Sequence, residues 1–162
     1  MITDIAALLR ALSGEGARFI VVGGAAAVAH GSARLTQDVD VVYAREADNL
    51  RRVVAALAPF KPYPRGAPPG LPFQWDERTL GNGLNFTLRT EIGAIDLFGE
   101  IVGGGGYADL LPHSGEIVVY GASCRLLSLE KLIAVKRAAG RPKDFEAIAE
   151  LEAILERQRG GA

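Results

Sequence analysis

The chain has 162 residues, of which 49% are hydrophobic, and its formal net charge is -1. This composition excludes an intrinsically disordered chain, and the charge lacks the strong positive balance of a general nucleic-acid binder. The length is typical of a single domain that buries a real hydrophobic core.

The sequence also favours a particular cellular compartment and predicts whether the chain contacts a membrane. The single cysteine, Cys124, cannot form an internal disulfide, so nothing indicates an oxidising environment. The N-terminal segment carries the charged residues Asp4 and Arg10 and has helical periodicity, unlike the apolar core of a signal peptide. The longest apolar stretch, residues 19–29, is interrupted by two glycines and is too short to span a bilayer. We therefore expect a cytoplasmic protein that has no membrane partner.

The first third of the chain alternates between helical and extended patterns. Apolar residues recur at helical spacing up to Leu12, and Thr3 or Asp4 can cap the start of that helix. Later segments are β-branched or rich in alanine, which favours strands and helices respectively. The elements predicted after the first helix are a buried strand at residues 18–23, a helix at 25–30, a strand at 38–43 and a helix at 47–57.

The rest of the chain is predicted to add strands and then two helices. Residues 59–72 contain six prolines and are expected to form a loop with extended segments. The predicted strands are residues 73–75, 84–90, 94–98 and 116–120, with a flexible glycine stretch at 103–106. The predicted helices are residues 129–139 and 145–155, which would form a C-terminal helical hairpin.

These elements predict an α/β (α+β) fold in which a mixed sheet is flanked by helices. We interpret residues 1–125 as the core, and residues 126–159 as a helical hairpin that packs on the same domain.

Two aspartates, Asp38 and Asp40, lie on one predicted strand. Side chains two residues apart on a strand point to the same face, with Cα atoms ~7 Å apart. Their carboxylates can therefore converge on one metal ion, or on a pair of ions ~4 Å apart. Without a cation, two acids on an apolar strand would cost desolvation and mutual repulsion. The alternative is that these aspartates only mark a turn at the end of a strand.

Asp96 is a lone carboxylate within a second apolar strand, residues 94–98. A buried aspartate needs a partner, which could be a metal, an arginine or a helix N-terminus. If this strand lies beside the strand that carries Asp38, Asp96 supplies a third carboxylate to the same site.

Gly23 and Gly24 separate a predicted buried strand from a short alanine-rich helix. Glycines at such a position let the backbone come close to an anion such as a phosphate. A simple tight turn is the alternative. The sequence around them matches neither a Walker A loop nor the dinucleotide-binding pattern GxGxxG.

Together, the segments VVGGAAAVAHGSARLTQDVDVVY and AIDLF resemble the DNA polymerase β-type nucleotidyltransferase superfamily. That pattern joins a Gly-Gly or Gly-Ser pair to Asp-x-Asp across about a dozen residues. Gly31 and Ser32 leave only five residues before Asp38, whereas Gly23 and Gly24 leave thirteen and are the better match. The segments GGAAAVAHG and RLTQDVD, with the C-terminal helical tail, look closest to minimal nucleotidyltransferases of the AbiEii toxin and antibiotic nucleotidyltransferase group.

The resemblance implies a Mg²⁺-dependent nucleotidyltransferase, with Asp38, Asp40 and Asp96 as ligands of two ions and Gly23 and Gly24 at the phosphates. A nucleoside triphosphate would donate a nucleoside monophosphate to an acceptor hydroxyl on a small molecule, a protein or an RNA end. Asp96 would also assist deprotonation of that hydroxyl.

Three further residues are candidates for the nucleotide. Lys136 shares a helical face with Leu132, so it could either reach the triphosphate or point to solvent. Arg34 and Thr36 precede the aspartate pair and could steady the loop or a phosphate. The cluster of charges from Arg137 to Asp144 is more typical of a solvated surface with local ion pairs.

Two other functions stay open at the level of sequence. The chain could be a toxin–antitoxin component that acts through a protein complex with an antitoxin. It could also be a nucleotide-binding module without turnover. Since little sequence remains for a separate acceptor domain, a homodimer could complete the site.

Overall fold

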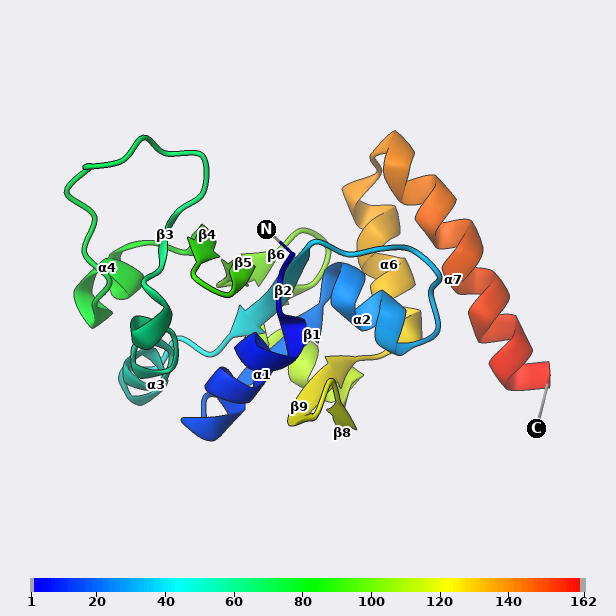
Figure 1. Cartoon of the computed structure of the whole chain (residues 1–162). Coiled ribbons are helices and arrows are strands. Elements are labelled where there is room, and N and C mark those ends of the chain that lie inside the picture. The colour runs from blue at the N-terminus through cyan, green and yellow to red at the C-terminus, as the bar shows by residue number, and fades with distance from the viewer. Residues whose placement is uncertain (1, 161–162) are drawn as a thin grey trace.

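The computed structural model describes residues 2–160, which are organised around a seven-stranded mixed sheet in the order β3-β4-β5-β2-β1-β9-β8 (Figure 1). The strands of this sheet are β1 (Phe19–Val22), β2 (Asp38–Tyr43), β3 (Tyr63–Pro64), β4 (Asn85–Thr90), β5 (Gly93–Phe98), β8 (Ser114–Val119) and β9 (Ala122–Leu127). A separate antiparallel pair comprises β6 (Glu100–Ile101) and β7 (Gly105–Gly106). In the main sheet β2 runs parallel to β5 and antiparallel to β1, which confirms the predicted mixed sheet.

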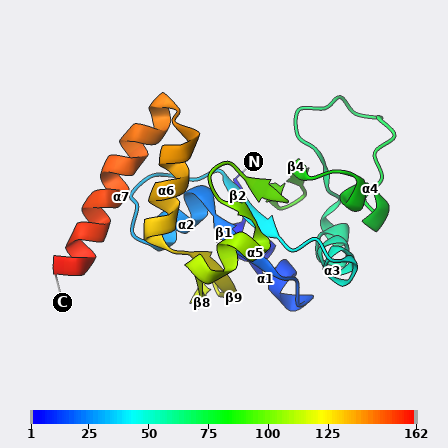
Figure 2. The ribbon, with the colours of Figure 1, turned by 180° about the vertical axis from the view of Figure 1, so that it is seen from behind.

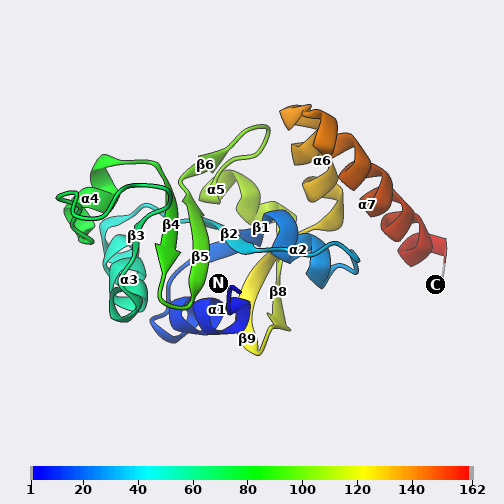
Figure 3. The ribbon, with the colours of Figure 1, turned by 45° about the horizontal axis from the view of Figure 1, so that its top comes forward.

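Helices flank this sheet at both ends and along its faces. The helices are α1 (Ile5–Gly14), α2 (Gly23–Ala29), α3 (Ala47–Leu57), α4 (Glu77–Asn82), α5 (Tyr107–Leu110), α6 (Leu129–Ala139) and α7 (Pro142–Gly160), with 3-10 turns η1 (Ala58–Phe60) and η2 (Leu111–His113). The α6–α7 pair lies at one end of the molecule and α3 with α4 at the other (Figure 2). Helix α1 lies along β9 and also contacts α3 (Figure 3). Within residues 2–160, none of the helices combines the length and apolarity that crossing a bilayer requires.

Local sequence explains the elements that lie closest to the aspartates. Strand β1 is buried at all four positions, as expected for a central strand that is covered on both faces. In β2, Val39 and Val41 are fully buried, whereas Asp38 and Asp40 alternate with them and point to the other face. Period-two alternation therefore positions both carboxylates while the valines anchor the strand in the core.

The predicted C-terminal helical hairpin is confirmed, and its turn has clear physical causes. Gly140 ends α6 in the left-handed conformation, and its backbone N–H donates to the Lys136 carbonyl. Pro142 is the first residue of α7, where a missing N–H has no cost. The Asp144 carboxylate accepts from the Arg141 backbone N–H and from its guanidinium, which closes the turn.

Three sequence predictions are wrong or incomplete. Residues 73–75 form no strand; Phe73 packs edge-on against Tyr63, and the Trp75 indole N–H donates to the Val54 carbonyl. The glycine stretch at 103–106, predicted to be flexible, contains β7 and helps to form the β6–β7 hairpin. Strand β9 was not predicted, and it pairs in parallel with β1 and lies between β1 and the edge strand β8.

Candidate active site

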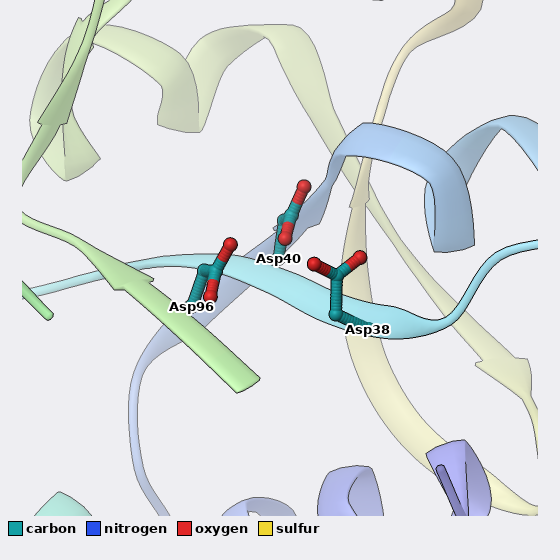
Figure 4. A group of neighbouring side chains, drawn as sticks. All are labelled: Asp38, Asp40 and Asp96. Atoms are coloured by element: carbon teal, nitrogen blue, oxygen red, sulfur yellow. The ribbon is translucent and has the colours of Figure 1, made fainter. Parts of the chain in front are cut away.

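The parallel pairing of β2 with β5 brings the three predicted aspartates together. Asp40 lies directly opposite Asp96 in the register, and Asp38 lies opposite Ala94. Each aspartate offers a carboxylate oxygen that lies within 4.8 Å of those of the other two. Figure 4 shows the three carboxylates projecting to the same side of the two strands, just below the start of α2. The strand adjacency that Asp96 requires is therefore confirmed.

The electrostatics of this aspartate triad (Asp38, Asp40 and Asp96) favour a cation. The pKa of Asp40 is raised to about 7, mainly because the carboxyl is shielded from solvent and in addition because the charges of Asp38 and Asp96 lie close to it. Burial also raises the pKa of Asp38, with Asp96 as the second cause. One oxygen of Asp40, Oδ1, is buried and has no hydrogen-bond partner among the described residues. A hard oxygen ligand set with an unsatisfied buried oxygen fits a divalent cation such as Mg²⁺.

The diglycine segment lies against this triad, and a residue larger than glycine would not fit at either of its two positions. Gly23 has a φ of +62°, and a Cβ on it would lie 2.2 Å from Oδ2 of Asp40. A Cβ on Gly24 would lie 2.8 Å from Oγ1 of Thr36. The β1–α2 turn therefore approaches the carboxylates as closely as backbone can, at the position where the sequence pattern placed a phosphate.

The triad and the diglycine segment line a cleft of about 740 Å³ between the sheet and the α6–α7 hairpin. The lining of this cleft contains both basic and apolar side chains, together with the carboxylates of the triad. The basic residues that line the cleft are Arg34, Lys136, Arg141 and Lys143. The apolar residues include Phe98, Ile101, Val102 and Val135. A polyanion with an attached planar or apolar group matches a cleft of this composition.

The remaining predicted residues have distinct positions. Thr36 steadies the loop, since its hydroxyl donates to the Asp38 carbonyl at 2.9 Å. Arg34 lines the cleft and is 3.6 Å from Glu150 of α7, so it also ties the loop to the hairpin. Lys136 lines the cleft and lies close enough to Asp144 to lower the pKa of that carboxyl. The structure therefore brings Arg34 and Lys136 to the cleft, whereas Thr36 supports the loop that leads into β2.

Neither a protein-family model nor a curated protein matches the sequence. The structure is similar to the crystal structure of an antigenic nucleotidyltransferase-like protein from Paracoccidioides brasiliensis. The TM-score is 0.54 at 18% sequence identity, and the match covers 94% of this chain and 73% of that chain. This chain has a nucleotidyltransferase-like fold.

Sequence analysis missed one residue that contacts the triad. Arg65 follows β3 in the proline-rich segment, and its Nη2 lies 2.5 Å from Oδ1 of Asp96. Its Nη1 lies 3.6 Å from Oδ2 of Asp38, and its positive charge offsets part of the rise that burial causes in the pKa of Asp38 and of Asp40. The one available signal was chemical, since three clustered carboxylates require a nearby cation and an arginine is the commonest candidate.

A second correction concerns the charge cluster from Arg137 to Asp144. The local ion pair predicted there is confirmed, with Nε of Arg141 2.8 Å from the Asp144 carboxylate. However, Asp144 is not a solvated surface residue, because it is only 2% exposed. The Arg141 hydrogen bond is the main cause that lowers the pKa of Asp144. Asp144 is therefore a satisfied buried acid at the entrance of the α7 helix.

Proposed function

We propose that the chain is a Mg²⁺-dependent nucleotidyltransferase that moves a nucleoside monophosphate from a nucleoside triphosphate to an acceptor hydroxyl. The observation that carries this proposal is the triad itself, in which Asp40 and Asp96 are in register below Gly23 and one Asp40 oxygen is unsatisfied. The nucleotidyltransferase-like fold supports it. The C-terminal helical tail resembles that of the AbiEii-type group, and this resemblance supports our proposal of that narrower assignment.

Each residue of the cleft has a role in this proposal. Asp38, Asp40 and Asp96 would hold Mg²⁺, two ions in the proposed mechanism, and these would neutralise the triphosphate and acidify the acceptor hydroxyl. The backbone of Gly23 and Gly24 approaches the carboxylates closely enough to contact a phosphate that shares their cation. Positioning and charge neutralisation are the main requirements of phosphoryl chemistry, so few other groups are needed.

Basic residues of the cleft would bind the rest of the triphosphate. Lys136 and Arg34 both line the cleft, and we assign them to the phosphates that leave as pyrophosphate. Asp96, at the β4 side of the triad, is our candidate to accept the proton of the acceptor hydroxyl. The acceptor itself is a small molecule, a protein or an RNA end.

The deciding experiment incubates the protein with each of the four α-³²P-labelled ribonucleoside triphosphates, Mg²⁺ and a cell extract. We expect metal-dependent transfer of label from one triphosphate into one product. The double variant Asp38→Asn/Asp40→Asn should abolish transfer, whereas Asp48→Asn, which pairs with Arg18 far from the cleft, should not.

The same experiment separates the alternative functions. Nucleotide and Mg²⁺ binding without transfer to any component of the extract would indicate a nucleotide-binding module. Absence of both nucleotide binding and transfer would overturn the proposed function and leave a toxin–antitoxin component that acts only through an antitoxin complex. Light scattering of the purified protein would test the homodimer independently.

A further inference from the structure

Arg65 is held beside the aspartate triad by several contacts from the β3–β4 edge of the sheet. Its backbone N–H donates to the Thr87 carbonyl at 2.9 Å, which fixes the residue next to β4. Its Nη2 donates to the Leu88 carbonyl at 2.9 Å as well as to Asp96. Its Nε is buried and has no hydrogen-bond partner among the described residues. The guanidinium is thus fixed in place but only partly satisfied.

The contacts of Arg65 use oxygens that a metal ion would also need. The guanidinium pairs with Asp96 and lies near Asp38, two of the three carboxylates that could ligate a cation. A divalent ion at the triad needs those carboxylates as inner ligands and repels the guanidinium. Arg65 and a metal ion therefore compete for the same site.

The sheet order indicates which side of the triad Arg65 serves. Strands follow in the order β3-β4-β5-β2-β1, so Arg65 lies beyond β5 and the diglycine segment lies beyond β2. The proposed triphosphate residues are on the diglycine side. A guanidinium displaced from Asp96 would keep its hydrogen bond to the Leu88 carbonyl. It would then need a new anion on the side of the triad that lies away from the diglycine segment.

We propose that Arg65 binds an anion after a metal ion has displaced it from the triad, an inference that rests on the proposed function. Cation binding releases Arg65 from Asp38 and Asp96, and Arg65 then binds an oxyanion of the acceptor. A guanidinium recognises phosphate and carboxylate groups through paired hydrogen bonds, so the acceptor carries one of these groups close to its reacting hydroxyl. Neutral acceptors would gain nothing from this residue.

The first test measures Mn²⁺ affinity at pH 8 by electron paramagnetic resonance for the wild type, Arg65→Gln and Arg89→Gln. Arg89 is the matched control, since it belongs to the same edge and stacks on Tyr63 instead of contacting the triad. We expect Arg65→Gln to bind Mn²⁺ about tenfold more tightly, and Arg89→Gln to stay close to wild type. Arg65→Lys, which keeps the charge, should also stay close to wild type.

These outcomes separate the inference from the proposed function. If the wild type does not bind Mn²⁺, the proposed metal site fails and this inference fails with it. If the wild type binds but Arg65→Gln binds equally or more weakly while keeping the wild-type circular dichroism spectrum, only the competition is overturned.

The second test examines the anion. Protein loaded with Mn²⁺ and a non-transferable triphosphate analogue is mixed with inorganic phosphate or with acetate, and paramagnetic relaxation of ³¹P or ¹³C is measured. We expect enhanced relaxation of phosphate or acetate in the wild type and in Arg89→Gln, and no enhancement in Arg65→Gln. The ion that responds identifies the anionic group that the acceptor carries. Equal relaxation in all three proteins would overturn the anion-binding role.

Discussion

Asp40→Asn is expected to stabilise the folded protein while it removes the metal site. The Asp40 carboxyl has a pKa of about 7 in the folded protein, against an ordinary value of 3.8. Because the pKa of Asp40 is raised in the folded state, its carboxyl group stabilises the fold most below pH ~4. This stabilisation is lost as the pH rises to 7. The amide of asparagine does not titrate, so the variant escapes this loss.

The size of the effect follows from the difference between the two pKa values. Each pKa unit corresponds to about 1.4 kcal/mol, so ionising Asp40 in the fold costs about 4 kcal/mol of unfolding free energy at pH 8. Asp40→Asn should therefore be close to neutral at pH 4 and more stable than wild type by up to about 4 kcal/mol at pH 8. That is a large fraction of the stability of an ordinary domain.

Urea denaturation in EDTA, followed by circular dichroism at pH 4 and pH 8, measures this difference. Asp48→Asn is the control of opposite sign, because a hydrogen bond from Arg18 lowers the pKa of Asp48, whose stabilisation is lost on acidification. Asp48→Asn should thus lose stability at pH 8 and little at low pH. Added Mg²⁺ should stabilise the wild type at pH 8 but not Asp40→Asn. Lower stability of Asp40→Asn than of wild type at pH 8 in EDTA would refute the reasoning.

Three further substitutions test the residues that support the site. Gly23→Ala should lower the unfolding free energy by about 1–2 kcal/mol, because alanine disfavours the left-handed backbone. The same variant should weaken Mg²⁺ binding in calorimetry. Gly14→Ala is the control and should do neither, because a Cβ at Gly14 would have no neighbouring atom within 4 Å. Glu150→Gln weakens the bonds to Ser32 and Ala33, so urea melts should show a small loss of stability and hydrogen exchange should speed up in residues 31–37. Unchanged exchange would contradict this anchoring. Leu97→Ala, at a fully buried position of β5, should cost about 2–5 kcal/mol in the same melts, and a loss below 1 kcal/mol would mean that β5 is not central.

The sequence predicted the strands that carry the aspartates because their signal is local. In β2 the alternation of Asp38 and Asp40 with buried valines is visible in six consecutive residues. The β5 strand has the same property around Asp96. The sequence left the adjacency of the two strands as a condition for a shared cation, and their parallel register meets that condition.

The sequence could not predict β9 or Arg65 because both depend on tertiary contacts. Strand β9 has the sequence ASCRLL, in which small and polar residues hide the alternation of buried Ala122, Cys124 and Leu126. Pairing with β1 determines its state, and that pairing spans about a hundred residues of chain. Arg65 lies 31 residues from Asp96 in a proline-rich segment with no repeating pattern. Only the β3-β4-β5 order brings it to the triad.

A comparison of Asp144 with Asp40 shows why the triad is best explained by a bound cation and not by structural need. Asp144 accepts from the Arg141 backbone N–H and from its guanidinium, and these bonds lower its pKa. This is how a fold satisfies an acid that it needs for a helix start. Asp40 has the opposite properties: burial raises its pKa, the neighbouring carboxylates add to the rise, and its Oδ1 has no partner among residues 2–160. Selection for stability alone would favour asparagine at Asp40, so retaining the carboxylate implies a ligand that offsets its cost.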